Sequence, residues 1–231
     1  MLNEQQGFET DPDFLPKFSR HLAHQLNNPI GAISSCAYLL EDFIASSTTG
    51  TLSVEDVRPF ITSIREECES MKLLVQEFSK FFATTGILTS PIELNEFLAH
   101  RVDEMQRGGL PVTMVETERR RTIEGDAGAV QSVIRILVED AIREGATTVA
   151  IELGSEEWPE ITIRDNRVKD VSPDAWTTQV EGFAPRHGGG VGLKLPLVGK
   201  LVRLHRGSIE ASSADPTGLI VRIRLPGMAT A

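Results

Sequence analysis

The residues best suited to chemistry lie in the octapeptide AHQLNNPI, residues 23–30. His24 carries an imidazole, which exchanges protons near neutral pH and can act as a nucleophile. Gln25 and Asn28 place side-chain amides beside it, and Pro29 removes a backbone hydrogen bond from the helix that the sequence predicts here. We therefore expect a reactive site next to a bend in a helix.

The surrounding sequence predicts one long amphipathic helix. Its apolar residues recur at steps of three and four, at Leu15, Phe18, Leu22, Leu26, Ile30, Ile33, Ala37, Leu40 and Ile44. At about 100° per residue, His24 points roughly 160° away from Leu22, and Asn28 lies within about 40° of His24. The imidazole and the amide are expected to share the exposed side, where a solvated histidine without a role is the alternative.

A second helix is predicted to begin near Val54, after a connection rich in Ser, Thr and Gly. Its apolar residues alternate by four and three, at Val57, Ile61, Ile64, Cys68, Met71, Val75, Phe78 and Phe82. Two such helices form an antiparallel hairpin, and two hairpins form a four-helix bundle. We expect a homodimer; packing of the hairpin on the chain's own C-terminal domain is the alternative.

The composition indicates a globular protein of one large or two small domains, with 231 residues of which 40% are hydrophobic. A formal net charge of -10 argues against binding to nucleic acid or anionic lipid. No run of 18 apolar residues occurs, so we expect no membrane segment and a cytoplasmic location.

After a break at residues 83–91 the pattern changes to mixed helices and strands. Helices are predicted at 96–106, 128–143 and 196–205, strands at 112–116, 148–153, 160–165, 208–211 and 219–225, and an irregular stretch from 166 to 192. This order favours an α/β sandwich with helices on one face of a sheet. The predicted domains are a helical hairpin at 14–84 and an α/β domain at 91–228.

A glycine-rich run, HGGGVGLKLP at residues 187–196, enters the last predicted helix. Exposed backbone N–H groups and the helix dipole make such a loop a cradle for phosphate, although a flexible surface loop is an equally good interpretation. Asp165 ends a predicted strand and offers a carboxylate to the amino group of a base; as an alternative it forms a turn.

These segments together resemble two-component sensor histidine kinases over about residues 14–226. The octapeptide resembles their phospho-acceptor box, and the hairpin resembles their dimerisation and phosphotransfer domain. The C-terminal half resembles their Bergerat-type ATP-binding domain in the order and spacing of its boxes: Gly125-Asp126 with residues 133–141, Asp165-Asn166, residues 190–195, residues 204–210 and residues 224–226.

The resemblance implies that His24 carries a phosphoryl group and that Asn28 positions water or the partner for dephosphorylation. It also implies an ATP site with Mg²⁺ at Asp140. The residues that it assigns to nucleotide binding are Asp140, Arg143, Asp165, Gly188, Gly190, Gly192 and Lys194.

Several positions depart from the family pattern. Gln25 stands where active kinases have an acidic base, and an amide accepts no proton at neutral pH. Asp140 replaces the magnesium-holding asparagine, and Ile136 replaces another polar residue of that box. Basic residues replace glycines in both glycine boxes, at Arg167, Lys169 and Lys194. We expect a weakened or absent ATPase activity.

Three functions fit this pattern. The first is a dimeric histidine phosphotransferase or pseudokinase, in which His24 exchanges a phosphoryl group with the aspartate of response-regulator receiver domains. The second is an active histidine kinase that uses ATP and Mg²⁺. The third is a scaffold that binds receivers while His24 stays inert.

Overall fold

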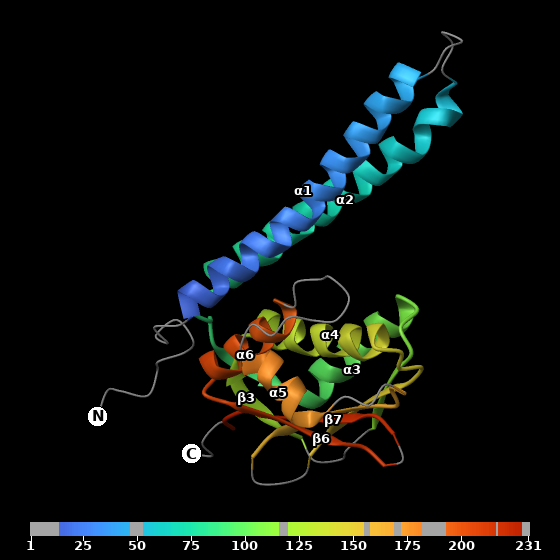
Figure 1. Ribbon diagram of the computed structural model, residues 1–231. Coiled ribbons are helices and arrows are strands. Elements are labelled where there is room, and N and C mark those ends of the chain that lie inside the picture. Colours follow the sequence, from blue (N-terminus) through green and yellow to red (C-terminus); the bar gives the residue numbers. More distant parts are fainter. Residues whose placement is uncertain are drawn as a thin grey trace. The chain divides into compact units, whose positions relative to one another are not determined.

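The computed structural model describes residues 14–46, 53–115, 120–154, 158–168, 172–181, 193–215 and 217–227 (Figure 1). The chain divides into two compact units: a helical unit that holds residues 9–83 with 185–193, and an α/β unit that holds residues 84–184 and 194–231 with 1–8. Among the described helices, none has the length and apolar content needed to cross a membrane.

The helical unit is a hairpin of α1 (Phe14–Ser46) and α2 (Val54–Ala83), which pack against each other. Helix α1 continues through Pro29 without interruption. Helix α2 begins at a capping box, because the Ser53 hydroxyl accepts from the backbone N–H of Asp56 at 3.3 Å while the Asp56 carboxylate accepts from the N–H of Ser53 at 3.2 Å.

Two sets of apolar residues in the hairpin each repeat every seven residues. The first set is buried or half-buried and comprises Leu26, Ile33 and Leu40 on α1 and Val57, Ile64, Met71 and Phe78 on α2. The second set is exposed and comprises Ile30, Ala37 and Ile44 on α1 and Ile61, Cys68, Val75 and Phe82 on α2. A single hairpin therefore covers only half of the apolar stripe.

The α/β unit contains two sheets and four helices among its described residues. The helices are α3 (Leu94–Arg107), α4 (Ala127–Arg143), α5 (Pro173–Glu181) and α6 (Lys194–Leu204). The strands are β1 (Ser90–Glu93), β2 (Val112–Val115), β3 (Thr122–Gly125), β4 (Val149–Leu153), β5 (Glu160–Asp165), β6 (Ser208–Ser213) and β7 (Leu219–Arg224).

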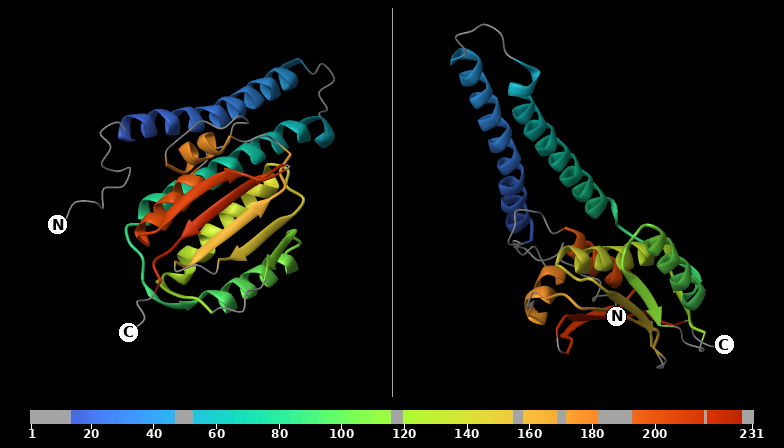
Figure 2. Two further views of the ribbon diagram at one scale, coloured as in Figure 1. Left: turned by 90° about the horizontal axis from the view of Figure 1, so that it is seen from below. Right: turned by 90° about the vertical axis from the view of Figure 1, so that its right-hand side faces the viewer.

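The larger sheet has the order β2-β4-β5-β7-β6, in which β2 and β4 are parallel and the other neighbours are antiparallel. Strands β1 and β3 form a separate antiparallel pair. The helices lie on one face of the larger sheet (Figures 1 and 2). Alternation along the strands buries Ile151, Ile161 and Ile163 between sheet and helices. This arrangement confirms the predicted fold class, a helical hairpin followed by an α/β sheet unit.

The predicted irregular stretch is wrong at residues 173–181, where the structure contains α5. Pro173 occupies the first position of α5, which tolerates proline. Trp176 and Val180 are buried and form one side of this short helix. The prediction also omitted the four-residue strands β1 and β3, although it included β2, which has the same length.

Candidate functional site

Helix α1 presents His24 and Asn28 on its exposed side, one helical turn apart. Gln25, the next residue along the chain, lies on a different side of the helix and is only 9% exposed. The structure thus leaves the imidazole and the Asn28 amide accessible to a partner and turns the Gln25 amide away from solvent.

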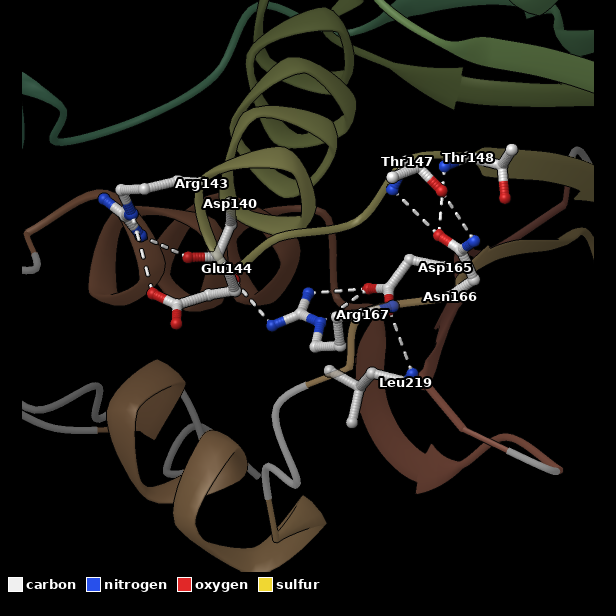
Figure 3. A network of polar contacts seen from close by, with 9 residues as sticks. All are labelled: Asp140, Arg143, Glu144, Thr147, Thr148, Asp165, Asn166, Arg167 and Leu219. Carbon is white, nitrogen blue, oxygen red and sulfur yellow. Dashed lines mark hydrogen bonds and ion pairs between the residues drawn. The ribbon is translucent and has the colours of Figure 1, made fainter.

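In the α/β unit, two sequence-predicted carboxylates are connected by a buried arginine (Figure 3). Asp140 on α4 is 4% exposed, Asp165 at the end of β5 is 5% exposed, and Arg167 between them is 3% exposed. The Nη2 of Arg167 lies 2.6 Å from Oδ2 of Asp165, and its Nη1 lies 3.5 Å from Oδ2 of Asp140. One guanidinium therefore bridges the two boxes.

The carboxylate of Asp165 receives hydrogen bonds from four donors. Its Oδ1 accepts from the backbone N–H groups of Arg167 at 3.0 Å and Leu219 at 3.1 Å. Its Oδ2 accepts from Nε of Arg167 at 2.8 Å, in addition to Nη2. A carboxylate has about four acceptor positions, so those of Asp165 are used within the protein.

Asp140 also has partners on both oxygens. Its Oδ1 accepts from Nη2 of Arg143, one turn further along α4, and its Oδ2 faces Arg167. Arg143, predicted to bind nucleotide, also lies 3.7 Å from a carboxylate oxygen of Glu144. Asp140 was predicted to ligate Mg²⁺; in the structure its carboxylate lies against the guanidinium groups of Arg143 and Arg167.

Lys194, at the start of α6, donates to a carboxylate oxygen of Glu139 at 3.2 Å. Burial acts to raise the pKa of Glu139, but hydrogen bonds from Arg135 and Lys194 outweigh it and hold that pKa below its usual value. The sequence prediction did not include Glu139. Its position beside Asp140 on α4 is the only signal for it.

The remaining site predictions have separate outcomes. Gly188, Gly190, Gly192 and Lys169 lie outside the described residues. Ile136 is buried at 8% exposure, as expected of an apolar residue on α4. Across the described part of the chain, no group of three or more His, Cys, Asp or Glu side chains is arranged to hold a metal ion.

The segment that carries Asp165 and Arg167 is held on its far side by Asn166 (Figure 3). The Asn166 Oδ1 accepts from the backbone N–H groups of Thr147 at 2.9 Å and Thr148 at 3.0 Å, and its Nδ2 donates to the Thr147 hydroxyl. These contacts fix the chain after β5 and so position the Arg167 side chain.

Residues 125–228 match the family model described as histidine kinase-, DNA gyrase B-, and HSP90-like ATPase. Among curated proteins, the chain is 22% identical to a sensor histidine kinase, ZraS of Klebsiella oxytoca, over 89% of its length. It is 24% identical to the sensor protein kinase WalK of Staphylococcus aureus over 97% of its length. The chain spans about half the length of these relatives, 44% of the first and 56% of the second.

Solved structures share the fold. The histidine kinase ThkA, in a crystal structure with the response regulator TrrA, matches 95% of this chain and 64% of its own with a TM-score of 0.66 and 16% identity. The histidine kinase AdeS of Acinetobacter baumannii matches 90% of this chain and 98% of its own with a TM-score of 0.62 and 15% identity. The ATPase family model and the curated relatives, together with the helical hairpin and the α/β sheet unit, support a member of the two-component histidine kinase family.

Proposed function

We propose that this chain is a dimeric histidine phosphotransferase of two-component signalling. An imidazole nitrogen of His24 attacks the phosphorus of an aspartyl phosphate on a response-regulator receiver domain. The P–N bond forms as the P–O bond to the aspartate breaks, the carboxylate leaves, and the imidazole proton passes to water. The reverse transfer passes the phosphoryl group to a second receiver.

The accessibility of His24 supports this role. A receiver must bring its aspartate to the imidazole, and both His24 and Asn28 lie on the exposed side of α1. The ThkA structure was solved with a response regulator, which makes a receiver domain the natural partner for the same fold here. We assign Asn28 to positioning the attacking group or a water, because its amide lies one turn from the imidazole.

The observation that carries the choice of phosphotransferase over kinase is the bridge made by Arg167. ATP is the expected ligand of the matched ATPase family, and binding through these boxes needs free acceptors on Asp140 and Asp165. Both carboxylates are buried and bound by guanidinium groups, so the residues present do not fit Mg²⁺ and a nucleotide. Gln25 also favours a phosphotransferase over a kinase, since its amide supplies no base for proton removal from His24.

The exposed heptad lines of the hairpin support the homodimer. Ile61 is 54% exposed, Val75 53% and Ile30 45%, and each belongs to a line of apolar residues repeating every seven positions. Burying such a line against a second hairpin removes apolar surface from water, and four helices then enclose one core.

The test is to incubate the purified chain separately with a phosphorylated receiver domain and with labelled Mg-ATP, and to measure phosphohistidine. We expect label from the receiver and none from ATP. His24→Ala is expected to abolish labelling. His100→Ala is the matched control, because His100 is an exposed histidine on α3 that lies outside the hairpin.

Each other outcome rejects the proposal in favour of one alternative. Label that enters His24 from Mg-ATP identifies an active kinase. Binding of a receiver without label from either source identifies a scaffold with an inert His24.

A further inference from the structure

We propose that the α/β unit has replaced an external ligand with an internal one: the guanidinium of Arg167 serves as the counter-ion of Asp140 and Asp165, and the unit is stable without nucleotide or divalent cation. This inference deepens the proposed loss of ATP chemistry. It does not depend on phosphoryl transfer at His24.

Burial makes the pairing of these charges necessary. A carboxylate at 4% or 5% exposure loses most of its hydration, and without a partner it strongly destabilises the folded state. Asp140 keeps Arg143 as a second cation, whereas among the described residues the only cationic side chain that the structure places on Asp165 is Arg167. Removal of Arg167 therefore leaves Asp165 as the more severely uncompensated charge.

The shape of arginine suits this position. Three guanidinium nitrogens of Arg167 are used in two directions, Nε and Nη2 toward Asp165 and Nη1 toward Asp140. A lysine ammonium is a single point charge and cannot form the paired hydrogen bonds to Asp165 while also reaching Asp140. The side chain also links two segments that are distant in sequence, α4 and the end of β5.

The test measures thermal unfolding of the full chain by differential scanning calorimetry, following the transition of the α/β unit. A ligand that binds only the native state must raise the unfolding midpoint. Because we expect no binding, millimolar Mg²⁺, ATP or Mg-ATP should leave the midpoint of the wild type unchanged. A saturable rise with any of these three would overturn the inference.

The second arm is a double-mutant cycle of Arg167→Ala and Asp165→Asn. Arg167→Ala is expected to lower the midpoint by roughly 10 °C, since it leaves a buried charge unpaired. In the double variant the loss should be smaller than the sum of the two single losses, because the asparagine side chain that replaces Asp165 carries no charge to leave unpaired. Additive losses would show that Arg167 contributes packing and no charge pairing with Asp165, and would contradict the proposal.

Arg164→Ala is the matched control, because Arg164 is an exposed arginine three residues earlier, on β5. Its midpoint should stay within about 2 °C of wild type. An Arg167→Ala midpoint equal to that of the control would overturn the inference. If Arg167→Ala does not fold, Arg167→Lys is measured in the same cycle and is expected to retain part of the coupling.

The two proposals fail separately. A cycle without coupling, in a chain that still accepts phosphate from a receiver, rejects only the internal ligand. A chain with strong coupling that accepts no phosphate at His24 rejects only the phosphotransferase function.

Discussion

Gly218 lies directly against the backbone of Asp165. Gly218 has φ +115°, and a Cβ at this position would overlap the carbonyl oxygen of Asp165 and lie 2.9 Å from its carbonyl carbon. The next residue, Leu219, donates its N–H to the Asp165 carboxylate at 3.1 Å. The residues just before and at the start of β7 thus contact Asp165 of the buried ion pair.

Gly218→Ala is expected to destabilise the α/β unit by at least about 2 kcal/mol more than Gly145→Ala. Both glycines have positive φ, but a Cβ at Gly145 meets nothing within 4 Å, so only backbone strain remains there. Urea unfolding of the two variants measures the difference. Equal losses would show that the contact with Asp165 carries no stability.

Asp126→Ala is expected to lower the free energy of unfolding by about 1 to 2 kcal/mol at neutral pH. Asp126 caps α4 by accepting from the N–H of Ala129 at 2.9 Å, and it also accepts from the N–H of Leu88 at 3.0 Å. Asp126→Asn keeps an acceptor oxygen, so it is expected to retain most of the stability that Asp126→Ala loses. Denaturant titrations of the three proteins at one pH test this order.

The same residue predicts a pH dependence. Hydrogen bonds from the backbone N–H groups of Ala129 and Leu88 hold the pKa of Asp126 below its ordinary value of 3.8. A carboxyl whose pKa is lower in the folded state stabilises that state above its unfolded value, and loses this contribution as the pH falls through the folded value. The advantage of wild type over Asp126→Ala should therefore be full well above pH 3.8 and shrink below it. An advantage that grows in acid would contradict the assignment.

Arg206→Gly is expected to stabilise the α/β unit by about 1 kcal/mol. Arg206 follows α6 and has φ +57°, a left-handed conformation that glycine adopts without steric cost. Arg206→Ala removes the guanidinium but keeps the strained backbone, so it should show no comparable gain. Chemical denaturation of both variants separates the backbone effect from a charge effect.

Gln25→Glu is expected not to restore autophosphorylation, even though it places a carboxylate beside His24. The proposed function places the limiting defect in the α/β unit, where Asp140 and Asp165 are bound to guanidinium groups. Incubation of this variant with labelled Mg-ATP is expected to leave His24 unlabelled, while transfer from a phosphorylated receiver continues. Label from ATP would show that the missing base alone had blocked a working kinase.

Val75→Glu is expected to convert the proposed dimer to a monomer, since a glutamate in the core of the proposed four-helix bundle would be buried without a partner. Val75 is 53% exposed on α2 and belongs to the exposed heptad line. Val115→Glu is the control, because Val115 is 51% exposed but lies on β2 of the other unit. Analytical ultracentrifugation measures the mass of both variants in solution. Equal masses for Val75→Glu and Val115→Glu would remove the support for this interface.

The amino-acid sequence by itself predicts the hairpin, the exposure of His24 and Asn28, and the main strands, because these depend on local periodicity. Steps of three and four identify α1 and α2, and short alternating runs identify β4 and β5. The order of the boxes then indicates the family. The four-residue strands β1 and β3 and the nine-residue helix α5 were missed, because a short element repeats its pattern few times; β2, also of four residues, was predicted.

Only the tertiary structure decided which charges meet. The sequence indicates that Arg167 replaces a glycine of the family's nucleotide box. It cannot show that Asp140, 27 positions earlier, and Leu219, 52 positions later, converge around the same side chains. It also cannot divide the apolar stripe of α2 into a covered line and an exposed line. Both outcomes depend on packing between distant segments, where a buried charge must find a counter-ion and one hairpin can cover only one seam.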